Sequence, residues 1–333
     1  MFVVDTHNAF VRRKGVLIMK KNKNTLSHKS AMRKSGFRLF LMILPLLALI
    51  FLFSYVPLYG WAYSFFNYKA GRKLFDCEFV GWKWFTLLFS DKYYRANLIR
   101  VMRNTLAMSF IDIGTSWLPM FFAVFLAEIT HKKYKKLVQT ATTIPHFISW
   151  VLVYAVAYAM FAVGDGFVNR LLAMFGVVEK GSGINFLAET DHMWLKMWLW
   201  GTWKGIGWSA VTYIAAISGV DQELYEAAEV DGANRWQKMW NITLPGLIPT
   251  YFVLLVLSIG NLINSGTDKY YVFQNAMNKE WLEVLDLYIY NQGLKGGLYS
   301  YTTAVGMMKS VISICLLTVA NWLSKVVRGT SVF

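Results

Sequence analysis

Three charged residues lie inside or close to long apolar stretches of the sequence, where a charge could serve transport or chemistry: Asp112, Lys204 and Lys309. Charged side chains within a membrane are costly, and they usually face a cavity or a partner group. Lys204, like Lys196, can also extend its ammonium group toward a membrane interface. We favour a structural role over substrate contact for each of these charges.

Five tryptophans lie close together in the sequence, and their rings could stack on sugars: Trp194, Trp198, Trp200, Trp203 and Trp208. Tryptophan is also the residue typical of the membrane interface. We therefore favour an interfacial or packing role over sugar stacking.

The sequence contains none of the common catalytic or nucleotide-binding motifs. It has no Gly-Lys dipeptide, and hence no Walker A phosphate loop, and it lacks the H-E-x-x-H, paired C-x-x-C and G-x-S-x-G patterns. The five histidines are scattered along the chain, so we predict no metal site and no cofactor. Cys77 is expected outside the membrane and Cys315 inside it, so the two should not pair. An enzyme has no positive support in these residues.

Composition points toward a lipid bilayer. The 333 residues are 56% apolar, 17% aromatic and 16% charged, whereas soluble domains average about 45–50% apolar and about 25% charged residues. This composition excludes a disordered chain, a coiled coil and a fibrous repeat. Composition alone does not separate membrane spans from a large buried core.

Six stretches of about 20 mostly apolar residues are each long enough to span a bilayer. Any one of them could be a buried helix of a globular protein, but six in a row, separated by polar segments, argue against that interpretation. The sequence therefore predicts an all-α integral membrane protein with six transmembrane helices, at residues 37–57, 105–127, 137–163, 193–217, 246–263 and 302–323.

Positive charge indicates how these helices are oriented. The net charge is +15, and ten Lys and Arg residues fall between Arg12 and Arg38, ahead of the first apolar stretch. Blocks of this kind mark cytoplasmic segments, and they fit membrane orientation better than binding of nucleic acid. We predict that both termini are cytoplasmic. The segments 128–136 and 218–245 then lie inside, and 58–104, 164–192 and 264–301 lie outside.

The first 36 residues are predicted to be a basic cytoplasmic tail. The basic region is too long for a signal peptide, and no small-residue cleavage site follows the first apolar stretch. Met1, Met19 or Met32 could each be the true start of translation. The predicted domains are this tail, a six-span domain at 37–328 and a short C-terminal tail at 329–333.

The inner segment from Asp221 to Pro249 is predicted to be a helix–bend–helix along the membrane surface. Its first part has high helix propensity, and Gly232 permits a bend of the backbone. A second helix follows, with Trp236, Met239 and Trp240 on one apolar face, and Pro245 is expected to end it. The segment is either a solvated surface helix or a docking element for another protein.

The residues of this segment resemble the EAA loop, the ATPase-docking segment in permease subunits of binding-protein-dependent ABC importers. The resemblance rests on a Glu-Ala-Ala triplet, a following Gly-Ala pair and a final Ile-Thr-Leu-Pro run, where Met239 stands at a position that is commonly Phe in the family. It implies ATPase-coupling roles for Glu226, Ala227, Ala228, Asp231, Gly232, Ala233, Ile242, Leu244 and Pro245.

Further segments are similar to the polysaccharide-type sugar permeases: residues 41–59, 67–68, 79–85 and 103–105. The resemblance covers about residues 37 to 328 and implies a type I importer permease for oligosaccharides in a bacterial plasma membrane. It also implies four kinds of partner: a second permease subunit, two cytoplasmic ATPase subunits, an extracellular sugar-binding lipoprotein and the lipid bilayer.

Polar residues near the predicted outer ends of spans five and six are candidates for the sugar path: Asn261, Asn264, Ser265, Thr302 and Thr303. Two other functions stay open. An ion-coupled secondary transporter would show inverted repeats and charges at the midplane of the membrane, and no convincing repeat is visible. A membrane-embedded enzyme would need a catalytic constellation, which the motifs do not supply.

Overall fold

The computed structural model describes residues 37, 39–179 and 183–328 of the chain. Among them every named element is a helix, and one isolated antiparallel bridge joins Phe66 and Phe79. The chain divides into two compact units, Met1–Ala62 and Tyr63–Phe333. Both predicted tails, 1–36 and 329–333, lie outside the described residues.

The first predicted span is helical and longer than expected. The sequence predicts an end at residue 57, but the helix runs over Leu39–Phe65. It continues as a wide π-helical turn, η1 (Phe51–Tyr55), and a tight 3₁₀ segment, η2 (Val56–Phe65). Pro57 lies in the first turn of η2, inside this continuous helix.

Three helical segments of the second unit are also long and apolar enough to cross a bilayer. Lys92–Ala127 contains α3 (Lys92–Gly114) and α4 (Leu118–Ala127). Arg235–Gly260 contains α10 (Arg235–Lys238), η4 (Met239–Thr243) and α11 (Leu244–Gly260). Tyr299–Val326 lies within α15 (Tyr299–Arg328). By length and composition, the described part of the chain thus has four such helices, or five if the bent pair below is one span.

The third predicted span is bent rather than continuous. It consists of α5 (Lys132–Phe147) and α6 (Trp150–Phe161), whose axes meet at 105°. Ile148 and Ser149 are extended between them, and the Ser149 hydroxyl accepts a hydrogen bond from the Leu152 N–H to cap α6. The apolar pattern continued across this break, so hydropathy alone could not reveal it.

The fourth predicted span is the helix α8 (Met193–Ile217). Its 25 residues would extend about 37 Å, which is enough to cross a bilayer. It is less apolar than the four helices above, because it carries Lys196, Lys204 and many tryptophans. All six predicted stretches are therefore helical, with the third one bent.

Pro245 does not end the helix that precedes it, contrary to the sequence prediction. The chain passes from α10 through the π-helical turn η4 into α11, in which Pro245 stands near the beginning. A proline ring clashes with the carbonyl four residues earlier. A π-turn widens the helix just ahead of it and gives that ring room.

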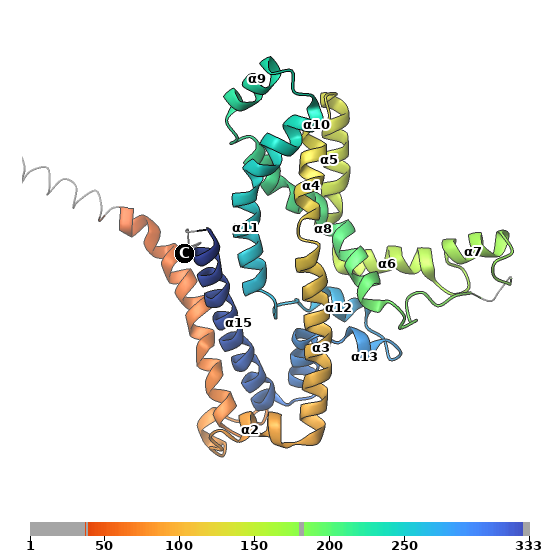
Figure 1. Ribbon diagram of the computed structural model, residues 1–333. Coiled ribbons are helices and arrows are strands. Elements are labelled where there is room, and N and C mark those ends of the chain that lie inside the picture. The colour runs from red at the N-terminus through yellow and green to blue at the C-terminus, as the bar shows by residue number, and fades with distance from the viewer. Residues whose placement is uncertain (1–36, 38, 180–182, 329–333) are drawn as a thin grey trace, which may run out of the picture. The chain divides into compact units, whose positions relative to one another are not determined.

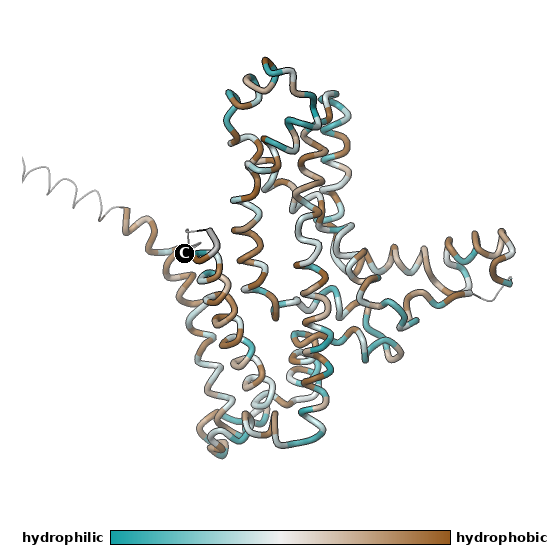
Figure 2. Tube along the Cα trace, in the orientation of Figure 1, coloured by the Kyte–Doolittle hydropathy of each residue, from teal (hydrophilic) through white to brown (hydrophobic). Residues whose placement is uncertain are grey.

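The remaining helices connect these segments. They are η3 (Leu74–Asp76), α2 (Lys83–Ser90), α7 (Phe167–Met174), α9 (Gln222–Val230), α12 (Asp268–Phe273), α13 (Lys279–Leu282), α14 (Leu285–Tyr290) and η5 (Asn291–Lys295). Within the second unit, α9 lies at one end, and α2 with the beginning of α3 lies at the opposite end (Figure 1). Brown, apolar residues dominate the long helices, and teal residues gather in the connections (Figure 2).

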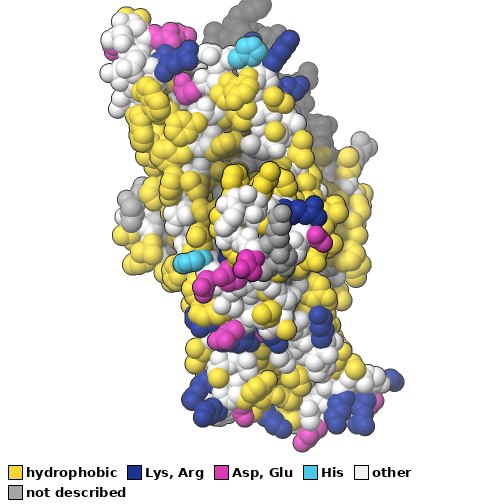
Figure 3. Space-filling view, turned by 90° about the vertical axis from the view of Figure 1, so that its right-hand side faces the viewer, with side chains coloured by type: hydrophobic (Ala, Val, Ile, Leu, Met, Phe, Trp, Pro, Cys, Tyr) yellow, Lys and Arg dark blue, Asp and Glu magenta, His cyan; other side chains and the backbone are white. Residues whose placement is uncertain are grey.

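Three clusters of buried apolar side chains hold the second unit together. One joins α4, α8, η4 and α11, a second joins α3, α6, α8 and α12–α14, and a third joins α2, α3, α14 and α15. On the face shown in Figure 3, hydrophobic side chains cover most of the upper half, and charged side chains lie at the top, around the centre and over the lower part.

Candidate functional site

The predicted docking segment begins with a capped helix. The Asp221 side chain accepts a hydrogen bond of 3.0 Å from the Glu223 N–H at the start of α9. Aspartate is favoured at this position because its carboxylate satisfies a free N–H of the first turn and opposes the positive end of the helix dipole. The fold thus fixes where α9 starts in this segment.

Gly232 makes the bend that the sequence predicts. It adopts φ +76°, in the left-handed region that favours glycine. The Ala233 N–H donates to the Ala228 carbonyl at 2.8 Å, and the Gly232 N–H donates to the Glu229 carbonyl at 3.1 Å. This pair of bonds is the Schellman motif, which ends a helix and turns the chain.

Two side-chain contacts fold the loop back on itself after this bend. Lys238 Nζ lies 2.6 Å from Glu229 Oε1, and the hydroxyls of Tyr225 and Thr243 are 2.9 Å apart. The hydrogen bond from Lys238, more than its charge, holds the pKa of Glu229 below its ordinary value. The two contacts tie α9 to α10 and η4, so the loop can move as one body.

Met239 connects this loop to the membrane helices. Its side chain is 3% exposed and lies in the apolar cluster formed with α4, α8 and α11. Gly246 allows a second close contact, because a Cβ there would lie 2.9 Å from Val220 Cγ2. A force on α9 would therefore reach the membrane helices through packed side chains.

The outer surface of α9 remains available for a partner. Glu226 and Ala227 are exposed, and Val230 is 89% exposed. Glu226 makes no hydrogen bond or ion pair with any residue that the structure describes. The surface offers a free carboxylate, small side chains and an apolar residue. Among the other residues implied in coupling, two are exposed, Asp231 and Pro245, and three are partly buried, Ala233, Ile242 and Leu244.

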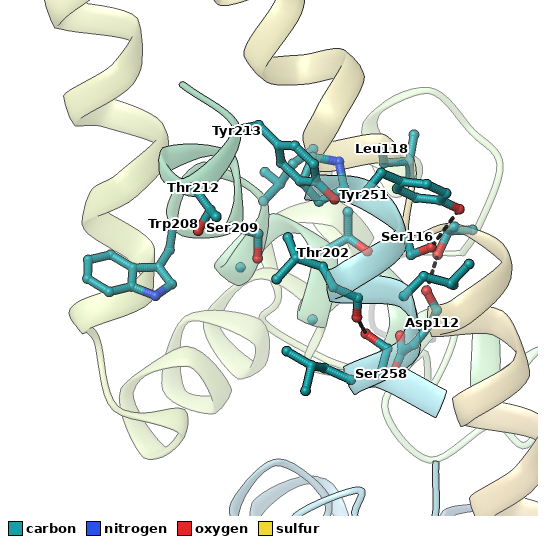
Figure 4. A pocket seen from close by; sticks show the side chains of 18 of the residues that line it. Asp112, Ser116, Leu118, Thr202, Trp208, Ser209, Thr212, Tyr213, Tyr251 and Ser258 are labelled. Carbon is teal, nitrogen blue, oxygen red and sulfur yellow. Dashed lines mark hydrogen bonds between the residues drawn. The ribbon is translucent and has the colours of Figure 1, made fainter. Parts of the chain in front are cut away.

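A polar cavity of about 510 Å³ lies between α3–α4, α8 and α11 (Figure 4). Hydroxyl groups of serine and threonine side chains line it together with aromatic rings. Ser116 and Tyr251 point toward one another, with their hydroxyls 3.2 Å apart. Other lining residues include Asp112, Thr115, Trp198, Thr202, Trp208, Ser209, Thr212, Tyr213, Ser258 and Asn261. Hydroxyls combined with aromatic faces can hold a polar, ring-shaped solute.

Only one of the five predicted sugar-path residues lines this cavity. Asn261 does so, and its amide oxygen accepts a bond of 3.3 Å from the exposed Asn264. The Ser265 hydroxyl is buried without a hydrogen-bond partner among the described residues. Thr302 and Thr303 donate to carbonyls of their own helix, at 3.0 Å and 2.8 Å. The sequence indicated polar positions but not the faces on which they lie.

Two of the three membrane charges have partners in the fold. Lys204 is buried and donates to the His146 carbonyl at 2.6 Å, at the C-terminal end of α5 where the chain bends. Lys309 pairs with Asp286, whose other oxygen accepts from the Gly266 N–H at 2.9 Å. These contacts support the structural roles favoured for both lysines.

Asp112 is different because its side chain is exposed to the cavity. Its carboxylate has no hydrogen bond or ion pair within the described residues. The charge of Lys269 acts on it, but the two groups form no ion pair within 4.0 Å. The structure therefore places Asp112 at the cavity wall, whereas the sequence favoured a structural role.

Two of the five clustered tryptophans line the cavity. They are Trp198, which donates to the Thr115 hydroxyl at 2.8 Å, and Trp208, which stacks on His146 with centroids 4.6 Å apart. Trp194 instead donates to the Trp281 carbonyl at 3.0 Å. The cluster is therefore divided between the cavity wall and packing.

A polar network between α3 and the 279–291 segment was not predicted as a site. Glu283 is 1% exposed, and its two oxygens accept from Arg100 at 2.6 Å and from Asn291 at 2.9 Å. The Asn104 amide donates to the Glu280 and Glu283 carbonyls. These bonds fasten the 279–291 segment to α3. The Arg-Asn-Thr triplet at 103–105 was the only signal for them.

Comparison with known proteins identifies the family. A family model described as "Binding-protein-dependent transport system inner membrane component" matches residues 120–329. The chain belongs to this family. Its relatives are transport permeases, not enzymes. It is 35% identical over 288 residues to Protein LplB of Bacillus subtilis (strain 168), which covers 86% of this chain and 88% of LplB.

A second relative is named for its substrate. It is the "Polygalacturonan/rhamnogalacturonan transport system permease protein YteP" of the same strain, 38% identical over 86% of this chain and 87% of its own length. Among solved structures, a chain of a bacterial alginate ABC transporter in complex with an alginate pentasaccharide-bound periplasmic protein matches with a TM-score of 0.78. It is 30% identical and covers 90% of this chain and 97% of that chain. The chain is therefore a permease of the sugar ABC transporter type.

Proposed function

We propose that this chain is the permease subunit of an ATP-driven importer that takes up oligosaccharides or polysaccharide fragments. It receives them from an extracellular sugar-binding lipoprotein, and it works with a second permease subunit and two cytoplasmic ATPase subunits. The observation that carries the proposal is the inner loop, whose exposed α9 surface is joined rigidly to the membrane helices through Met239.

The loop is suited to coupling because it is stiff and has a free outer surface. The Schellman motif, the Glu229–Lys238 pair and the Tyr225–Thr243 bond hold α9 against α10 and η4. Glu226 and Ala227 offer a carboxylate and a small side chain to a groove in an ATPase, as in helix-in-groove recognition. Closure of the ATPases would then move the helices that line the polar cavity.

The polar cavity is the proposed route of the sugar. Its hydroxyl and aromatic lining suits saccharides, and it lies between helices that the loop contacts through Met239. The names of the relatives support carbohydrate cargo: one is a polygalacturonan/rhamnogalacturonan permease and another is an arabinooligosaccharide permease. Asn261, on the cavity wall, is retained as a path residue.

The proposed topology has six membrane-spanning segments in a bacterial plasma membrane, with both termini in the cytoplasm. The segments are the four long apolar helices, the bent α5–α6 pair and α8. The separation of α9 from α2 to opposite ends of the second unit supports opposite sides of the membrane for them (Figure 1). Membrane-impermeant labelling of single cysteines introduced at residues 227 and 92 tests this arrangement.

The experiment that tests coupling is capture of the ATPase on the loop. Ala227→Trp places a large ring on the exposed face of α9, and Ala276→Trp is the matched control at an exposed alanine in the 264–301 segment. We expect Ala227→Trp to abolish ATPase co-purification and sugar uptake, while Ala276→Trp retains both. Retention of both by Ala227→Trp would refute docking at α9.

Energy dependence separates the importer from an ion-coupled transporter. In proteoliposomes that contain the purified assembly, uptake of oligosaccharides should require ATP and the binding protein, and it should survive collapse of ion gradients by ionophores. Uptake that needs a gradient but no ATP would support the ion-coupled alternative instead.

A further inference from the structure

A second cavity, distinct from the polar one, lies between α6 and α8. It measures about 570 Å³, and its walls are almost entirely apolar, with Val156, Met160 and Phe161 on α6 and Leu199 and Trp203 on α8. This volume lies within the roughly 300–1,000 Å³ of small-molecule sites. Among the residues that the structure describes, its lining has no hydroxyl-bearing side chain, so it does not suit a sugar.

The cavity is continuous with a surface that suits lipid. Leu195, Leu199 and Trp203 recur every four residues along α8 and are 47%, 53% and 44% exposed. Residues four apart share one face of a helix, so these three form an exposed apolar stripe beside the cavity. Leu199 and Trp203 belong to both.

Two opposite charges stand at the rim. Lys196 lines the cavity in the first turn of α8, and its Nζ lies 3.7 Å from a carboxylate oxygen of Glu189. The two side chains are 27% and 46% exposed. Lys196 Nζ also donates to the Glu189 carbonyl at 3.1 Å. This loose, partly exposed pair leaves donor capacity free on Lys196 and acceptor capacity free on Glu189.

The order of residues along α8 matches the order of headgroup and acyl chain in a phospholipid. Trp203 lies seven residues beyond Lys196, which is about 10 Å along a helix axis. A headgroup at Lys196 would therefore place its acyl chain along Leu199 and Trp203, where the apolar cavity begins. Such an arrangement keeps both charges at the headgroup level and the apolar walls at the level of the hydrocarbon.

We propose that this cavity binds one acyl chain of a phosphatidylethanolamine molecule. The phosphate lies on the Lys196 ammonium, and the headgroup ammonium lies on the Glu189 carboxylate. Both charges at the rim then have a complement on one lipid. The site is independent of the import function proposed above. In the topology proposed there, the lipid belongs to the outer leaflet.

The test uses photoreactive lipids in nanodiscs that contain the full chain together with the subunits that co-purify with it. The probes are phosphatidylethanolamine and phosphatidylglycerol that carry a diazirine on the acyl chain, and adducts are mapped by mass spectrometry. Met160→Trp fills the cavity from α6. Val151→Trp is its control, because Val151 is 63% exposed on the opposite face of α6 and does not line the cavity.

We expect phosphatidylethanolamine adducts on residues 156–161 and 193–203, lost in Met160→Trp and retained in Val151→Trp. Lys196→Gln and Glu189→Gln should each lower this labelling about twofold to fivefold, as expected for one exposed charge contact. The phosphatidylglycerol probe should label these residues less than the phosphatidylethanolamine probe does. In Glu189→Gln, the difference in labelling between the two lipids should become smaller.

Three results would overturn the proposal. If Met160→Trp were labelled by phosphatidylethanolamine as strongly as the wild-type protein, the acyl chain would not lie in the cavity. Equal labelling by the two lipids would remove the headgroup assignment. Labelling of the isolated chain but not of the assembled transporter would show that a partner subunit covers this surface.

Discussion

The bend at Gly232 allows a quantitative test of the coupling loop. Gly232 has φ +76°, and a Cβ built on it would have no neighbour within 4 Å among the described residues. Replacement by alanine therefore adds no clash, and its cost is that of a left-handed backbone, about 1–2 kcal/mol. By the relation between free energy and equilibrium constant, Gly232→Ala should raise local opening of the bend about 5- to 30-fold.

Hydrogen exchange of the loop measures this opening directly. The Ala233 N–H is bonded to the Ala228 carbonyl, so it exchanges only when the Schellman motif opens. A peptide that covers residues 224–240 should exchange faster by the same 5- to 30-fold factor. Gly176→Ala is the matched control, since Gly176 has φ +73° and no neighbour within 4 Å, but lies in a different segment.

Gly232→Pro should have a larger effect than Gly232→Ala. Proline fixes φ near −65° and has no N–H, whereas Gly232 needs a positive φ and donates to the Glu229 carbonyl. We expect this variant to insert into the membrane normally and to lose uptake. Unchanged exchange in Gly232→Ala, or normal uptake by Gly232→Pro, would refute the claim that the bend positions α9 for docking.

Three further predictions concern other contacts. Glu283→Ala leaves Arg100 without its buried partner and should cost about 3–5 kcal/mol of stability, seen as a lower thermal unfolding midpoint; an unchanged midpoint would contradict this. Lys204→Met removes the donor at the end of α5 and should cost about 1–3 kcal/mol, with faster hydrogen exchange at residues 146–150 if the bend depends on it. The lowered pKa of Glu229 means that its contact with Lys238 is fully present above the ordinary value of 4.5 and weakens as pH falls through the lowered pKa. Glu229→Gln should therefore lower the protection factors of α9 at pH 7, while wild type should lose this protection only in acid, when exchange is corrected for the intrinsic rate at each pH.

The helices could be predicted from the sequence because lipid requires long apolar runs with all backbone groups bonded internally. The bend at Gly232 was equally predictable, since few other residues adopt a positive φ. The turn between α5 and α6 was not. It depends on Lys204 reaching the His146 carbonyl and on Gly207 fitting against Thr142, where a Cβ would lie 2.3 Å from the carbonyl oxygen. Both contacts join residues about 60 positions apart in the chain.

The second feature that the sequence could not predict is which face of each helix points toward the interior. Thr302 and Thr303 carry the right groups for a sugar path, but their hydroxyls bond within α15. Ser116 lies in the turn between α3 and α4, Tyr251 lies in α11, and the two meet only in the fold. Hydropathy gives the length of a span but not its rotation, because an all-round apolar helix has no pattern that marks its inner side.

The three membrane charges together show why the polar cavity is the better place to seek the sugar path. A buried charge needs a partner, and Lys204 and Lys309 have theirs, in the His146 carbonyl and the Asp286 carboxylate. Asp112 has no direct contact of that kind, and its carboxylate faces the cavity between α3–α4, α8 and α11. Lys269 acts on it from beyond ion-pair distance, and water or a polar solute in the cavity would reduce the cost of this charge further. A charge placed there is consistent with a hydrated route through the apolar helices, and Asp112 lies on its wall.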